Sequence, residues 1–122
     1  MDWNFRNDQP IYSQLIQRLT EAIVSGVYAP GEKLPSVREL ALEAGVNPNT
    51  VQRSLTELER EGLVFSQRTA GRFVTENENM IVNAKLRIAD ERVSEFLRSM
   101  KTLGCGRQEI ISLIGGAKED EE

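Results

Sequence analysis

Residues 36–53 read SVRELALEAGVNPNTVQR, and this segment carries the densest set of local folding signals in the chain. Ser36 is followed three residues later by Glu39, which is the spacing of a capping box. In a capping box the serine hydroxyl and the glutamate carboxylate each accept a hydrogen bond from a backbone amide that the helix itself leaves unpaired. This pattern predicts a helix over 36–44, which Gly45 ends.

The same segment then predicts a second helix. Asn47 offers a side-chain oxygen as a cap, and Pro48 is well tolerated in the first helical turn, so a helix is expected over about 48–61. Ala41 and Val51 match the small and the buried positions that let two helices cross closely around a glycine turn. The segment is therefore predicted to form a helix-turn-helix.

The flanking sequence adds one helix and one hairpin. Residues 10–25 carry apolar side chains at four-residue spacing, which predicts an amphipathic helix. The β-prone stretches 63–67 and 72–75 flank a turn at 68–71, and this order predicts a pair of antiparallel strands. A helix, a helix-turn-helix and a hairpin make a winged helix. The expected fold class is mainly α with a small β-hairpin (α+β).

The C-terminal part is predicted to be helical. From about 79 to 103, apolar residues alternate four and three positions apart, which is typical of a helix that packs on another helix. This apolar seam consists of Val82, Leu86, Ala89, Val93, Phe96, Met100 and Leu103. A short last helix follows, and the acidic residues 119–122 are expected to be disordered. The predicted domains are a winged helix at 1–76 and a helical dimerisation tail at 77–122.

The apolar seam predicts a homodimer. The winged helix already has a core of its own, so a leftover apolar stripe is expected to be covered by a second copy of the chain. Such a dimer would space two recognition helices for a palindromic DNA site. Trp3 and Phe5 precede the first helix and are expected to pack on the tail or on the partner.

Composition excludes several classes of function. The 122 residues include 15 Lys and Arg against 19 Asp and Glu, a net charge of −4, so no overall basic excess indicates a nucleic-acid partner. The absence of histidine and the single cysteine remove the usual ligands of a zinc site, a histidine-based triad and an internal disulfide. We therefore expect no enzyme activity, no metal and no cofactor. No apolar run could span a bilayer and no signal-peptide pattern opens the chain, so a cytoplasmic protein without a membrane partner is expected.

Local charge nevertheless favours DNA. The stretch between Ala44 and Thr56 contains no acidic residue. Its polar side chains gather at the start of the second predicted helix: Asn47, Asn49, Thr50, Gln52 and Arg53. Asn and Gln suit adenine and Arg suits guanine in the major groove, and the positive end of a helix dipole favours phosphate. The predicted hairpin carries Arg68 and Arg72 without any acid, which suits phosphates or a minor groove.

Four motifs together resemble a known family. They are PIY at 10–12, Y-x-P-G-x-x-L-P-S-x-R-x-L-A at 28–41, VNPNTV at 46–51 and L-E-x-E-G-L at 58–63. This combination is similar to the GntR family of bacterial transcription regulators over residues 9–76. The remaining residues are too few for the larger C-terminal domains of other branches, so the two-helix tail resembles the short YtrA-like branch. That resemblance implies a dimeric repressor.

The resemblance also implies which residues contact DNA. Arg38 would grip phosphate or a guanine, and its alternative role is a surface ion pair with Glu39 or Glu43. Four residues would face the groove: Asn49, Thr50, Gln52 and Arg53. Gly71 would lie at the tip of the wing. The family wing reads glycine, a basic residue and glycine where this chain has Thr69-Ala70-Gly71, which leaves Arg68 and Arg72 as possible replacements.

The expected function is that of a sequence-specific transcription regulator, a repressor that binds double-stranded DNA. Two other readings remain open, namely a winged helix that binds proteins, and a regulator that senses a small-molecule effector in a pocket of the tail helices. Two residue roles also remain open. Asn47 is a cap or a base reader, and either Gln52 or Arg53 reads bases.

Overall fold

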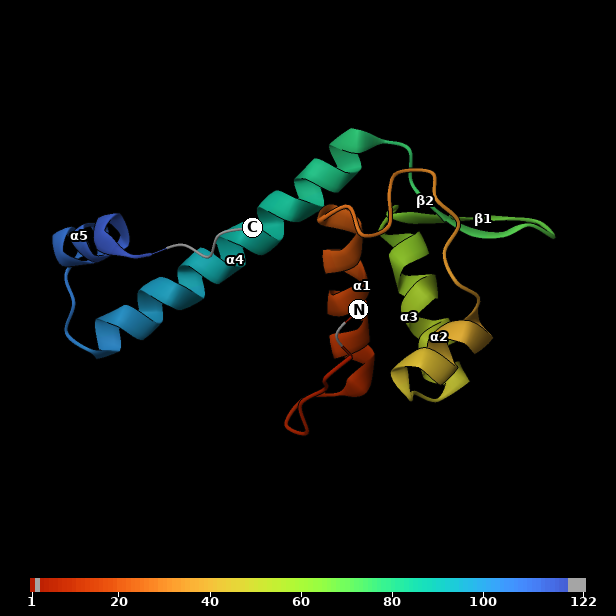
Figure 1. Ribbon diagram of the computed structural model, residues 1–122, viewed down its shortest axis with the longest axis horizontal. Coiled ribbons are helices and arrows are strands. Elements are labelled where there is room, and N and C mark those ends of the chain that lie inside the picture. The colour runs from red at the N-terminus through yellow and green to blue at the C-terminus, as the bar shows by residue number, and fades with distance from the viewer. Residues whose placement is uncertain (2, 119–122) are drawn as a thin grey trace. The chain divides into compact units, whose positions relative to one another are not determined.

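A computed structural model describes residue 1 and residues 3–118. Its elements follow one another as α1 (Ile11–Val24), α2 (Val37–Ala44), α3 (Pro48–Arg60), β1 (Val64–Gln67), β2 (Gly71–Val74), α4 (Glu78–Thr102) and α5 (Arg107–Gly116) (Figure 1). The predicted fold class, mainly helical with one antiparallel hairpin and two C-terminal helices, is confirmed. The predicted disorder of 119–122 concerns residues that lie outside the described part.

The helix-turn-helix forms through the local interactions that the sequence predicts. The amide of Glu39 donates to the Ser36 hydroxyl at 3.1 Å, and the amide of Ser36 donates to the Glu39 carboxylate at 3.0 Å. Gly45 has a φ of 67°, a left-handed conformation that glycine adopts without a steric penalty. Asn47 then caps α3, because its side-chain oxygen accepts from the amide of Asn49 at 2.8 Å.

The core lies where α1 packs on α3 (Figure 1). The buried side chains come from both helices, from α2, from the hairpin and from the segment before α2: Leu15, Leu19, Ile23, Leu34, Leu40, Val51, Leu55, Leu58, Leu63, Val64 and Val74. Because α3 buries Val51, Leu55 and Leu58, its remaining faces are left for contacts outside the core.

The hairpin pairs Val64 with Val74 at its base and Gln67 with Gly71 at its end. A third segment adds to the free edge of β2. The amide of Leu34 donates to the carbonyl of Arg72, and the amide of Val74 donates to the carbonyl of Glu32, both at 2.9 Å. The loop before α2 is therefore tied to the wing, which the sequence analysis did not foresee.

The N-terminal segment packs on the winged-helix core. Trp3 and Phe5 are half-buried against it, and the Trp3 indole donates to the Glu43 carboxylate of α2 at 3.1 Å. This contact with the winged-helix core was not part of the expectation, which placed the two rings on the tail or on a partner. The physical reason is an anchor that periodicity does not reveal, because the buried Gln14 holds this segment by side-chain hydrogen bonds.

The chain forms two compact units, Met1–Lys85 and Leu86 onward. The first unit includes the start of α4, because Ile81 and Ala84 join its hydrophobic cluster. This grouping differs from the predicted domain boundary at 76/77, which followed secondary structure rather than packing. In the second unit Ile110 is buried.

Replacing Gln14 by alanine should lower the free energy of unfolding by about 1–3 kcal/mol. The side-chain NH2 group of Gln14 donates to the backbone carbonyls of Arg6 and Gln9 at 2.8 and 2.9 Å. Its side-chain oxygen accepts from the backbone amide of Arg6 at 2.7 Å. Urea denaturation followed by circular dichroism measures the change.

The matched control is Gln17→Ala, an exposed glutamine on the same helix, which should change stability by less than about 0.5 kcal/mol. Equal effects of the two substitutions would contradict the anchoring role of Gln14.

Candidate nucleic-acid interface

The first turns of α3 present an exposed polar surface. Asn49, Gln52 and Arg53 are exposed, Thr50 is half-buried, and the first turn contains no acidic residue. The helix dipole gives this end a partial positive charge that favours an anion. The Asn47 side-chain oxygen is already engaged, which confirms its role as a cap.

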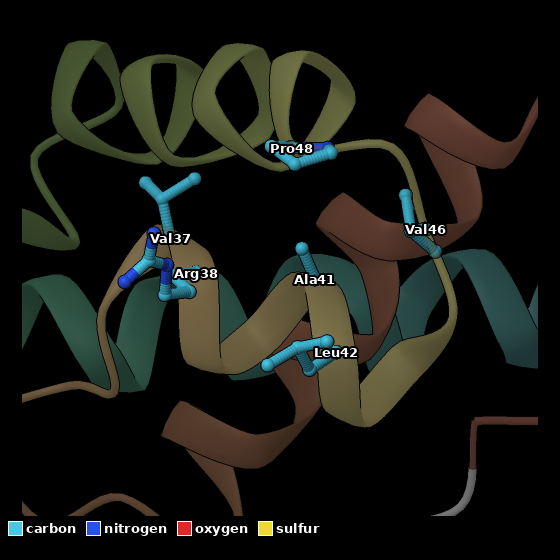
Figure 2. Close-up of a pocket in the computed structure, with 6 residues that line it drawn as sticks. All are labelled: Val37, Arg38, Ala41, Leu42, Val46 and Pro48. Atoms are coloured by element: carbon cyan, nitrogen blue, oxygen red, sulfur yellow. The ribbon is translucent and has the colours of Figure 1, made fainter.

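Arg38 lies beside this surface. Together with Val37, Ala41, Leu42, Val46 and Pro48 it lines an open cleft of about 510 Å³ between α2, the turn and the start of α3 (Figure 2). Arg38 of α2 and Pro48 of α3 therefore line the same cleft, which places Arg38 next to the first turn of α3.

The alternative ion pair of Arg38 is not formed. Glu39 accepts from Ser36 in the capping box, and Glu43 accepts from the Trp3 indole. Among the described residues, Arg38 makes no hydrogen bond or ion pair, and it is exposed. Its charge is therefore available to an anion from outside the protein.

Gln52 and Arg53 point in different directions. The guanidinium carbon of Arg53 lies 4.3 Å from the centre of the Tyr12 ring, so this side chain stacks on α1. Gln52 is rotated about 100° from Arg53 around the helix axis. It shares a side of α3 with Glu59, two turns further on, and Glu59 contacts the hairpin. The Arg53–Tyr12 stack escaped sequence analysis because its partners are far apart in the chain.

The tip of the wing is the turn Arg68–Ala70, closed by a hydrogen bond from the Ala70 amide to the Gln67 carbonyl. Thr69 has a φ of 68°, in the left-handed region that favours the glycine of the family pattern. Gly71 opens β2 opposite Gln67 instead of lying at the tip itself. Arg68 is exposed and, within the described part of the chain, makes no ion pair.

Arg72 is held by the protein. Its Nε donates to Oε1 of Glu59 in α3 at 2.5 Å, and the Ser66 hydroxyl donates to the same oxygen at 2.7 Å. Partial burial raises the pKa of the Glu59 carboxyl, but the hydrogen bonds from Ser66 and Arg72 and the charge of Arg72 outweigh it and hold that pKa below the usual range. Glu59 is therefore a carboxylate at neutral pH and neutralises Arg72.

Lys33 is a basic residue that sequence analysis missed. The exposed Lys33 side chain lies against Gly71 at the start of β2. Its Cε is 3.1 Å from the position that a Cβ would take on this glycine. The bridge between Lys33 and Phe73 brings it to the wing. No local pattern signals this placement, because it depends on pairing across the sheet.

Over residue 1 and residues 3–118, no group of three or more Cys, Asp and Glu side chains is arranged to hold a metal ion. No helix in that part combines the length and apolarity needed to cross a membrane.

Comparison with known proteins identifies the family. The family described as bacterial regulatory proteins, gntR family, matches residues 11–74. The HTH-type transcriptional repressor YtrA of Bacillus subtilis is 41% identical, covering 94% of this chain and 95% of the relative. A GntR family transcriptional regulator from Listeria monocytogenes superposes with a TM-score of 0.87 at 35% identity, covering 93% of this chain and all of the other.

A further solved structure, AraR(DBD) in complex with operator ORE1, superposes with a TM-score of 0.53 at 26% identity and covers 62% of this chain and 94% of the other. YtrA is named a transcriptional repressor and the Listeria protein a transcriptional regulator. The chain belongs to the GntR family of bacterial regulatory proteins and matches its short member YtrA over nearly the full length of both chains.

Proposed function

We propose that this protein is a repressor that binds a palindromic operator as a homodimer in the bacterial cytoplasm. The observation that carries the proposal is the exposed Arg38 beside the capped, acid-free start of α3. Two relatives support it, because YtrA is named a repressor and AraR(DBD) was solved with an operator. A net charge of −4 does not oppose this function, since DNA responds to the charge it faces rather than to the total.

The residues proposed to contact DNA are five exposed side chains and the half-buried Thr50: Arg38, Asn49, Thr50, Gln52, Arg53 and Arg68. Gln52 is the favoured base reader, because its side of α3 adjoins the hairpin and its side chain is exposed. Arg53 is assigned to the DNA backbone, since its stacking on Tyr12 directs it toward α1. Asn47 keeps its cap, and Gly71 shapes the end of the wing.

Arg38→Ala should weaken binding to DNA from upstream of the protein's own gene by about 5- to 150-fold, or ~1–3 kcal/mol, if Arg38 contacts a guanine with both nitrogens. A gel-shift titration measures the affinity. Arg60→Ala, at the opposite end of α3 and paired with Glu57, is the control and should bind nearly as tightly as the wild type. A folded Arg38→Ala protein that keeps full affinity would overturn the proposed surface.

Gln52→Ala and Arg53→Ala should differ in kind. Loss of a base contact at Gln52 should cost about 1–3 kcal/mol on the operator and little on random-sequence DNA. Loss of a phosphate contact at Arg53 should weaken both DNAs alike and lower the salt-dependence slope by about 0.9. Competition titrations at several salt concentrations separate the two effects, and the reverse pattern would exchange the two assignments.

The proposed homodimer rests on the exposure of the apolar seam. Leu103 is 75% exposed, Val93 is 55% exposed and Phe96 is 41% exposed on α4. Of the other seam residues, Val82, Leu86 and Ala89 are exposed and Met100 is half-buried. In α5 the apolar Ile111, Leu113 and Ile114 are exposed as well. So much apolar surface on helices is unusual for a monomer and indicates a partner helix.

Phe96→Glu should convert the dimer to a monomer without loss of helix content, because it places a charge in the middle of the seam. Sedimentation velocity measures the mass and circular dichroism the helicity. Ser94→Glu, an exposed position off the seam, should leave the dimer intact. A monomeric wild type, or a dimeric Phe96→Glu variant, would contradict the interface.

A further inference from the structure

The contact of Glu59 with the hairpin links the recognition helix to the wing. Glu59 lies in the last turns of α3, and its Oε1 accepts hydrogen bonds from Ser66 of β1 and from Arg72 of β2. Ser66 and Arg72 are direct cross-strand partners. One carboxylate oxygen therefore joins both strands of the hairpin to α3.

This contact lies beyond the part of the hairpin that the core holds. Side chains two residues apart on a strand share a face, so Ser66 and Arg72 lie on the same face as the buried pair Val64 and Val74. The core fixes the Val64–Val74 pair by apolar packing. Glu59 holds the next pair on the same face, Ser66 and Arg72, which lies two residues closer to the turn at Arg68.

The pairing segment before α2 has a different effect. Its hydrogen bonds to the carbonyl of Arg72 and the amide of Val74 run along the outer edge of β2. Edge pairing fixes the strand in the plane of the sheet, whereas a side-chain contact on the sheet face limits how far the hairpin tilts from α3. The two contacts restrain different motions.

The ion pair with Glu59 neutralises Arg72 and weakens its attraction for DNA phosphates. Its side chain is 20% exposed and that of Glu59 is 29% exposed, so the ion pair is partly shielded from water. Arg68, four residues away and exposed, has no such partner among the described residues. The two arginines of the hairpin therefore differ in availability although they look equivalent in the sequence.

We propose that Glu59 is a positioning residue that holds the wing against the recognition helix, and that Arg72 serves this contact instead of binding a phosphate. Arg68 then supplies the phosphate contact of the hairpin. The inference rests on the proposed DNA-binding function for its second half, whereas the positioning of the hairpin is a property of the protein without DNA.

The first test measures the positioning in the DNA-free protein by amide hydrogen exchange. Glu59→Ala should speed the exchange of amides in residues 66–72 about tenfold relative to those of α1. Glu59→Gln, whose amide oxygen can still accept, should restore much of the protection. Glu57→Ala removes the ion pair with Arg60 on the same helix and should leave the hairpin unchanged. Unchanged hairpin exchange in Glu59→Ala, or faster exchange throughout α1 and the hairpin alike, would overturn the positioning role.

The second test measures the dependence of DNA affinity on salt, with a duplex from upstream of the gene. The double variant Glu59→Gln/Arg72→Gln should keep the wild-type slope, whereas Arg68→Gln should lower the slope by about 0.9, the value of one phosphate contact. A lower slope in the double variant would place Arg72 on a phosphate, and an unchanged slope in Arg68→Gln would remove Arg68 from the contact; either result overturns this half. If the wild type itself fails to bind DNA, the proposed function fails, while the exchange test still decides the role of Glu59.

Discussion

The packing of α1 against α3 is the contact on which the other features of this protein depend. Val51, Leu55 and Leu58 turn one face of α3 into the core, and the polar residues of its first turns are left outside. Burial of these aliphatic side chains is the dominant favourable term in folding, so the orientation of α3 follows from the core. The exposure of this polar surface therefore follows from the packing that stabilises the fold.

Within that surface, pairing inside the protein determines which charges remain available. Arg72 is neutralised by Glu59, whereas the exposed Arg38 and Arg68 make no ion pair within the described residues. An acidic chain can therefore present a basic face, because several of its carboxylates are engaged elsewhere: Glu39 in the capping box, Glu43 in a hydrogen bond from the Trp3 indole, and Glu57 and Glu59 in ion pairs. Net charge is a poor guide to the partner of such a small protein.

The C-terminal helices raise a different physical problem. A winged helix with its own core leaves the apolar seam of α4 unsatisfied, and that seam stays exposed along most of its length. The start of α4 behaves otherwise, since Ile81 and Ala84 lie in the winged-helix cluster. One helix thus belongs to the core at its beginning and exposes apolar side chains further on.

The helices and their ends could be predicted from the sequence, because they depend on local interactions. The capping box of Ser36 and Glu39, the cap at Asn47 and the turn at Gly45 involve neighbours in the chain, and the buried positions of α1 and α3 repeat with the helical period. The roles of Arg53, Arg72, Lys33 and the N-terminal rings were not readable, because each depends on a residue from another element: Tyr12, Glu59, Phe73 and Gln14. Periodicity reports which face of a helix is buried, but the partner of an exposed side chain is set only when the packed core brings distant segments together.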